Sequence, residues 1–97
     1  TFQESVAFGD FEATYALAIA DIDQDGDPDI VVANVNSANS VYLNSDEGTR
    51  WTEVKLGGFT ATTYGLDIGD LNLDGYPDLG FGNSNSFNRI FYNTGPR

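Results

Sequence analysis

One acidic stretch occurs twice in this chain, as Asp21-Ile22-Asp23-Gln24-Asp25-Gly26-Asp27-Pro28-Asp29 and again as Asp70-Leu71-Asn72-Leu73-Asp74-Gly75-Tyr76-Pro77-Asp78. Both copies carry a carboxylate or amide side chain at positions 1, 3, 5 and 9. Glycine at position 6 permits a sharp turn with positive φ, and proline at position 8 fixes φ where the stretch ends. The alternate oxygen-bearing side chains of each copy are therefore predicted to converge on one point.

Both stretches are predicted to be calcium-binding loops, with one Ca²⁺ per loop and two per chain. Calcium takes six to eight oxygen ligands, whereas magnesium keeps its waters and requires a strict octahedron. An EF-hand is excluded because it needs flanking helices and a Glu at position 12, where this chain has Val32 and Phe81. The predicted side-chain ligands are Asp21, Asp23, Asp25, Asp29, Asp70, Asn72, Asp74 and Asp78, and the predicted carbonyl ligands are those of Asp27 and Tyr76.

A simpler interpretation is that these residues only make turns, because Asp, Asn and Gly are common there. The presence of two copies in register favours the metal site over a turn alone. Asn72 stands where the first copy has Asp23, which lowers the ligand charge of the second loop and, we expect, its affinity.

The rest of the chain follows the same repeat, since the sequence aligns with itself without a gap at a shift of 49 residues. Thr14–Asp21 falls on Thr63–Asp70, and the asparagines that follow the loops coincide as well. The chain is therefore divided into repeat 1 (residues 1–49) and repeat 2 (residues 50–97). A unit of this length lies in the range of a four-stranded propeller blade.

The strand pattern predicts an all-β fold of two tandem four-stranded antiparallel β-propeller blades. In residues 15–19, Tyr, Leu and Ile alternate with Ala, which is typical of a strand that is buried on both faces. Further strands are expected at Ile30–Ala33, Val41–Leu43, Trp51–Leu56, Leu79–Gly82 and Ile90–Tyr92.

The fourth, outer strand of each blade has two possible assignments. In the repeat division above it comes first, at Phe2–Phe8 and at Trp51–Leu56. Alternatively, a hairpin at Ser45–Gly48 joins Trp51–Leu56 to the strand before it, and Phe2–Phe8 pairs with another chain. The hairpin is favoured because a short connection joins neighbouring strands.

Two blades cannot close a ring of four to eight and would leave apolar flanks exposed. We therefore expect a homo-oligomer, a trimer or tetramer that closes a six- or eight-bladed ring, or else a piece cut from a longer propeller.

Composition excludes several classes of function. The formal net charge of −11 opposes binding to nucleic acid and to anionic membranes, and no apolar run has the length of a membrane span. The absence of His and Cys removes disulfides, the usual zinc ligands and the Ser–His and Cys–His pairs of hydrolases. Every clustered pair of carboxylates lies within a predicted calcium loop, so we expect no enzyme.

At the two loops and their flanking strands, the chain resembles the FG-GAP repeat, also called the VCBS-type repeat. Such repeats build the propellers of integrin α-chains and of many secreted proteins, including lectins. The resemblance implies calcium binding at loop positions 1, 3, 5 and 9, a non-enzymatic interaction scaffold and an extracellular location. It also leaves a lectin-like carbohydrate binder as the alternative function.

Two further groups of residues allow a binding or a structural interpretation. The motif Asn-x-Asn-Ser-x-Asn at 34–39 and 83–88 suits sugar hydroxyls or hairpin turns, and turns are favoured. Aromatic residues suit sugar stacking or packing between blades, and packing is favoured, with Phe87 the best candidate for exposure. The aromatic residues concerned are Tyr15, Trp51, Tyr64, Phe87 and Tyr92.

Overall fold

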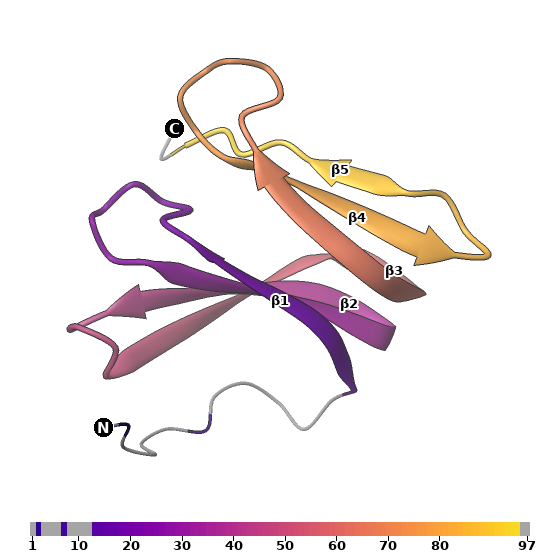
Figure 1. Ribbon diagram of the computed structural model, residues 1–97, viewed down its shortest axis with the longest axis horizontal. Helices are drawn as coiled ribbons and strands as arrows, with labels where there is room; N and C mark the ends of the chain where they lie inside the picture. The colour runs from indigo at the N-terminus through magenta and orange to yellow at the C-terminus, as the bar shows by residue number, and fades with distance from the viewer. Residues whose placement is uncertain (1, 3–6, 8–12, 96–97) are drawn as a thin grey trace.

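The computed structural model describes residues 2, 7 and 13–95, and for residues 58–61 the backbone only. These residues form one antiparallel sheet in the order β1-β2-β3-β4-β5 (Figure 1). The described part of the chain has no helix, and so no helix that could span a membrane. The all-β prediction is confirmed. The strands are β1 (Thr14–Ala20), β2 (Asp29–Ser45), β3 (Arg50–Gly69), β4 (Asp78–Ser84) and β5 (Arg89–Phe91).

The long strand β2 doubles back on itself. Seventeen residues in a straight strand would extend about 55 Å, yet the longest dimension of the molecule is 40 Å. Asn36 has a φ of 57°, and the amide of Asn44 donates to Asp29 Oδ1 at 2.9 Å, which brings the two ends of β2 together. β2 therefore contains both strands predicted within it, joined by a turn at residues 34–39.

The strand β3 also has two parts. Arg50–Leu56 pairs with the second part of β2, and Thr62–Gly69 pairs with β4. Before β3, the chain turns through Asp46, Glu47 and Gly48, which have φ values of 52°, 56° and 88°. The expected hairpin is thus present. The division between repeat 1 and repeat 2, at residues 49 and 50, lies inside it. The strand expected at Phe2–Phe8 falls almost wholly outside the described residues.

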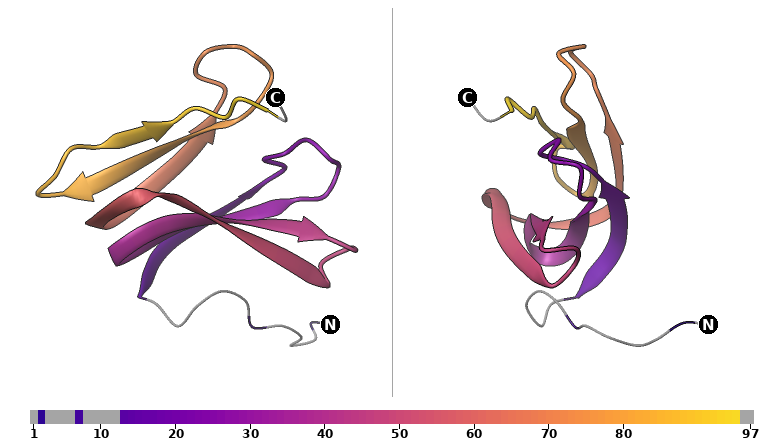
Figure 2. Two further views of the ribbon diagram at one scale, coloured as in Figure 1. Left: turned by 180° about the vertical axis from the view of Figure 1, so that it is seen from behind. Right: turned by 90° about the vertical axis from the view of Figure 1, so that its left-hand side faces the viewer.

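The sheet consists of two halves, which face each other across the core (Figures 1 and 2). The first half-sheet is β1, β2 and Arg50–Leu56, and the second is Thr62–Gly69, β4 and β5. The buried core joins Ile22, Val31, Ala33 and Val41 to Leu79 and Phe81 of the second half-sheet. Full burial of such a side chain stabilises the fold by roughly 1.5–3 kcal/mol.

One face of β1 is open, although the sequence predicts burial on both sides. Leu17 and Ile19 are 55% and 64% exposed, whereas their counterparts Leu66 and Ile68 pack against the core. The two described half-sheets cover each other on one face only, and Leu17 and Ile19 lie on the opposite face of β1. That face is open at β1 itself, whereas Val32 of β2, which pairs with Leu17, is only 5% exposed.

Most of the aromatic residues expected between blades are also exposed. Tyr15 and Tyr64 stack on each other, with ring centroids 5.0 Å apart and planes at 13°. Tyr15 lies near the start of β1 and Tyr64 in the second part of β3, each where the strand register shifts, and both are more than half exposed. Tyr15 belongs to repeat 1 and Tyr64 to repeat 2, so their stacking is a contact between the repeats, although both rings stay exposed. Tyr92 is also exposed, and the exposure of Phe87 is confirmed.

Candidate metal centres

The first loop is folded back on itself by carboxylates that accept backbone amides. Asp21 accepts from the amides of Asp25 at 3.1 Å and Gly26 at 2.9 Å. Asp25 in turn accepts from the amide of Asp27 at 2.9 Å, which fixes position 7 of the loop. Gly26 has a φ of 95°, so glycine is the residue that permits this turn.

Asp29 closes the loop from inside the protein. Its side chain is fully buried, and its two oxygens accept from the amides of Ile22 at 2.8 Å and Asn44 at 2.9 Å. A buried carboxylate requires such partners because burial removes its water. These bonds tie the start of the loop to its end and to the far part of β2.

Three carboxylates of the first loop converge. Oxygens of Asp21, Asp23 and Asp29 lie within 4.8 Å of one another. Local desolvation, a hydrogen bond with Asp25 and repulsion by Asp29 raise the pKa of Asp23 to about 6. The amide of Asp27, by contrast, holds the pKa of Asp25 below its ordinary value.

The second loop has the same frame of hydrogen bonds. Gly75 has a φ of 94°, and the fully buried Asp78 again closes the loop. Asp70 accepts from the backbone amides of Asp74 at 3.1 Å and Gly75 at 2.7 Å. Asp74 accepts from the backbone amide of Tyr76 at 3.0 Å. Asp78 accepts from the backbone amides of Leu71 and Asn93, both at 2.8 Å. The repeat in sequence is thus a repeat in geometry.

The loops differ at position 3. With its amide nitrogen turned inward, Asn72 donates to Asp70 at 3.2 Å and to Asp74 at 3.1 Å. In the opposite orientation, the side-chain oxygen of Asn72 would point between Asp70 and Asp74, where it could bind a cation. Among the described residues, only the first loop brings three carboxylates this close together.

The donor sets fit a hard divalent cation in both loops. Each offers carboxylate oxygens on a frame that backbone amides hold, with no nitrogen or sulfur ligand. This chemistry suits calcium or magnesium rather than a transition metal. The structure brings Asp21, Asp23 and Asp29 together as the sequence predicts, and it holds Asp25 beside Asp23.

Sequence reasoning missed a link from the second repeat to the first loop. The side-chain amide of Asn93 donates to the carbonyl of Ile22 at 2.7 Å, across 71 residues of sequence. Its counterpart Asn44 donates to the carbonyl of Pro28 at 2.9 Å, within its own repeat. Asn44 lies near the end of β2 and Asn93 two residues beyond β5, and nothing in the repeat signals that one of them bonds across the repeat boundary.

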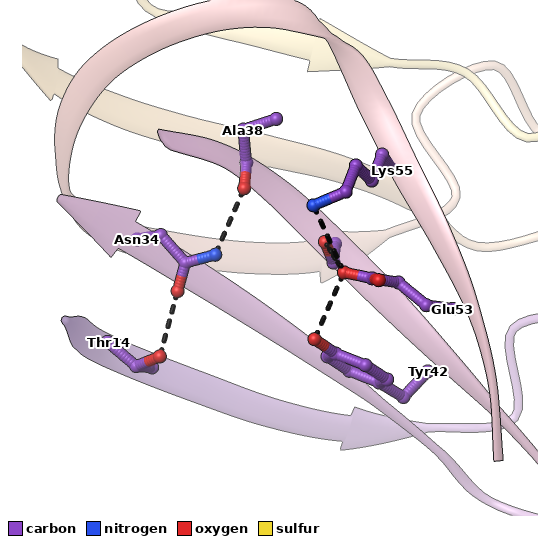
Figure 3. A network of polar contacts seen from close by, with 7 residues as sticks. Thr14, Asn34, Ala38, Tyr42, Glu53 and Lys55 are labelled. Carbon is purple, nitrogen blue, oxygen red and sulfur yellow. Dashed lines mark hydrogen bonds and ion pairs between the residues drawn. The ribbon is translucent and has the colours of Figure 1, made fainter. Parts of the chain in front are cut away.

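The asparagine motifs after the loops serve the turns. The side-chain amide of Asn34 donates to the carbonyl of Ala38 at 3.0 Å, and its backbone amide donates to the side chain of Asn39 at 2.7 Å. Figure 3 shows Asn34 also accepting from Thr14, at 2.8 Å. Asn83 makes the corresponding bonds to Phe87 and Asn88, at 2.8 and 2.9 Å. The turn interpretation is confirmed for these bonds.

A carboxylate outside the loops is held in a structural network. Ser40 and Tyr42 donate to Glu53 at 2.8 and 3.1 Å, and Lys55 lies 3.5 Å from it (Figure 3). The hydrogen bond from Ser40, followed by that from Tyr42, lowers the pKa of Glu53. Glu53 thus takes part in a hydrogen-bonded network that links β2 to β3.

Comparison with known proteins gives one match. Residues 21–81, more than half of the chain, match the family described as the FG-GAP-like repeat. Neither curated proteins nor solved structures give a significant match to the chain.

Proposed function

Because the chain belongs to the FG-GAP-like repeat family, we propose that it is a calcium-binding β-propeller module that serves as a non-enzymatic interaction scaffold. The observation that carries the proposal is the convergence of Asp21, Asp23 and Asp29 within 4.8 Å. The same hydrogen-bonded frame recurs in the second loop, which supports one ion in each.

The first ion would be held by Asp21, Asp23, Asp25, Asp29 and the carbonyl of Asp27, and the second by Asp70, Asn72, Asp74, Asp78 and the carbonyl of Tyr76. Bound calcium supplies positive charge where carboxylates repel one another. Because the unfolded chain has no such cluster, the free energy of calcium binding would also stabilise the fold. Sites that fill only at millimolar calcium would be occupied outside the cell, so a secreted location forms part of the proposal.

Calorimetric titration with CaCl₂ and with MgCl₂ tests the proposal. We expect two calcium sites, with weaker or absent magnesium binding, and a higher melting temperature in calcium than in EDTA. Asp21→Asn should remove one site, whereas Asp46→Asn removes the same charge in an exposed hairpin and should remove none. Absence of calcium binding in the folded wild-type chain would overturn the proposal.

We also propose that the module self-assembles, because the open face of β1 leaves Leu17 and Ile19 in solvent. Three or four copies with two blades each would close a six- or eight-bladed ring. Molar mass by light scattering in millimolar calcium tests this: a discrete trimer or tetramer supports the ring, and a monomer at all concentrations contradicts it.

A carbohydrate ligand is the second candidate function. The stacked pair Tyr15 and Tyr64, 56% and 61% exposed, favours it because flat aromatic faces can pack against the C–H faces of sugars. Glycan-array binding that is lost in Tyr64→Ala would support a lectin. Absence of binding across the array would leave the protein-interaction scaffold as the better assignment.

A further inference from the structure

The chain has a face on its first repeat that is open, although the equivalent face of the second repeat is covered. We call the outward side chains Leu17 and Ile19 the β1 face, and they are 55% and 64% exposed. At the same positions of the second repeat, Leu66 and Ile68 pack against the core. The first repeat covers them there.

The second repeat has the opposite open face. Asp67, Gly80 and Ile90 form a row across β3, β4 and β5, which we call the β5 face. Ile90 is 53% exposed. The matching residues of the first repeat include Val31 and Val41, which are 0% and 4% exposed in the core.

The two open faces are therefore the two halves of an interface that the chain already makes once. Inside the chain, the Leu66 and Ile68 side of the second repeat packs against the Val31 and Val41 side of the first. The β1 face is the counterpart of the side with Leu66 and Ile68. The β5 face is the counterpart of the side with Val31 and Val41. The two half-sheets already pack on each other through their opposite sides, so the described residues of one chain cannot also bring the two open faces together.

The glycines of the second repeat support a docked partner. Gly65, Gly69, Gly80 and Gly82 stand where the first repeat has Ala16, Ala20, Val31 and Ala33. None of these glycines has a positive φ. An added Cβ would meet nothing within 4 Å at Gly65 and Gly69, and only a carbonyl at 4.0 Å at Gly80 and Gly82.

Neither space nor backbone within this chain thus requires glycine at these positions. Three of the four, with Asp67 and Ile90, line an open hollow of about 320 Å³ on the β5 face. A hollow of this kind can receive branched side chains from a facing surface.

We propose that a second copy of this chain docks head to tail, with its β1 face on the β5 face of the first, so that its Leu17 and Ile19 enter the glycine-lined hollow. The inference rests on the self-assembly proposed above and names the surfaces that make it. A contact between two different faces leaves one copy with a free β1 face and the other with a free β5 face. Such contacts produce a closed ring or an open filament, not an isolated symmetric dimer.

Mixing two face variants tests the inference. Leu17→Glu removes the β1 face and Ile90→Glu removes the β5 face, and both sites are more than half exposed, so the fold should survive. In millimolar calcium we expect the wild-type chain to form multimers and each variant alone to be monomeric. An equimolar mixture should give a dimer, because each variant supplies the face that the other has lost. Phe87→Glu, at an exposed turn outside both faces, should assemble like wild type.

If the wild-type chain assembles but the mixture stays monomeric, or a single variant still assembles, head-to-tail docking is wrong although the chain does self-assemble. A wild-type chain that stays monomeric would overturn both docking and self-assembly. Calcium binding is measured separately by titration and would be unaffected by either result. Melting curves in calcium confirm that each variant is folded before its mass is interpreted.

Discussion

Position 3 is where the two loops differ as ligand sets, with Asp23 in the first and Asn72 in the second. We expect Asp23→Asn to lower the calcium affinity of the first loop by about tenfold, because it removes a carboxylate from a convergent cluster. Asn72→Asp should raise the affinity of the second loop by a similar factor. Titration calorimetry checks each change against a chain in which the other loop is inactivated, by Asp70→Asn or Asp21→Asn. Equal affinities before and after the exchange would mean that the charge at position 3 does not contribute to calcium binding.

Asp23 should also make calcium binding depend on pH. Without calcium the pKa of Asp23 is about 6, above the ordinary 3.8. Between pH 3.8 and pH 6, the folded ion-free chain therefore keeps a proton on Asp23 that the unfolded chain has lost. Because the folded chain binds this proton more tightly, protonation of Asp23 stabilises the ion-free fold. The stabilisation is full below about pH 3.8 and is lost as pH rises through 6. Calcium needs the ionised form, so its affinity for the first loop should fall by up to about tenfold per pH unit below 6. Titrations at pH 7.0 and 5.0 measure the fall, and Asp23→Asn should abolish it.

At this scale, sequence predicts what is local. The positions of the carboxylates, the turn role of Gly26 and the role of Asn34 each follow from residues within one loop or turn. The bond from Asn93 to Ile22 does not, because two residues 71 positions apart meet only when the half-sheets have packed. The inward amide of Asn72 is likewise set by the three-dimensional position of its neighbours.

Among the elements, the loops between the first two strands of each repeat depend on one backbone conformation. We expect Gly26→Ala to destabilise the protein by about 1–2 kcal/mol, because φ is 95° there and an L-residue is strained in that region. Nothing lies within 4 Å of the added Cβ, so any loss reflects backbone strain and not a clash. Gly69→Ala is the matched control: its Cβ is equally free, its φ is not positive, and Ala20 occupies the same position in repeat 1. Chemical unfolding in EDTA compares the two, and equal stabilities would contradict the argument.

The link from Asn93 should couple the two repeats. Asn93→Ala removes the donor to the carbonyl of Ile22, a residue that is only 8% exposed. Loss of that bond should cost about 1–2 kcal/mol of stability. It should also weaken calcium binding in the first loop, although Asn93 lies in the second repeat. Titration with the second loop inactivated by Asp70→Asn measures this effect, and Phe87→Ala serves as the exposed control. An unchanged first loop would show that the bond has no part in the site.

Element order and pairing were more predictable than burial. Alternation in residues 15–19 locates β1, and the short connection at Ser45–Gly48 identifies the hairpin. The same alternation predicts burial on both faces, yet each repeat has one open face: Leu66 packs against the core in repeat 2, whereas its counterpart Leu17 in repeat 1 is exposed. A sequence pattern records the environment in which a strand is stable, and part of that environment can come from another copy.

On the scale of the whole molecule, charge and assembly should be linked. The chain has a formal net charge of −11, and two bound Ca²⁺ ions would bring it to about −7. Copies that approach head to tail would repel one another less with calcium bound, and their loops would then be better ordered. We therefore expect assembly in millimolar calcium and monomers in EDTA.

Salt separates charge from loop order as the cause. At about 1 M salt the screening length falls to about 3 Å, so repulsion between copies is largely removed while the loops remain without calcium. If repulsion is what prevents assembly, 1 M NaCl in EDTA should restore part of the multimer. If the loops must be ordered first, the chain should stay monomeric at high salt, and near-ultraviolet circular dichroism should show a change only on adding calcium. Light scattering across the four combinations of salt and calcium distinguishes these causes, and assembly that is equally strong in all four would contradict any link between the metal centres and the docking faces.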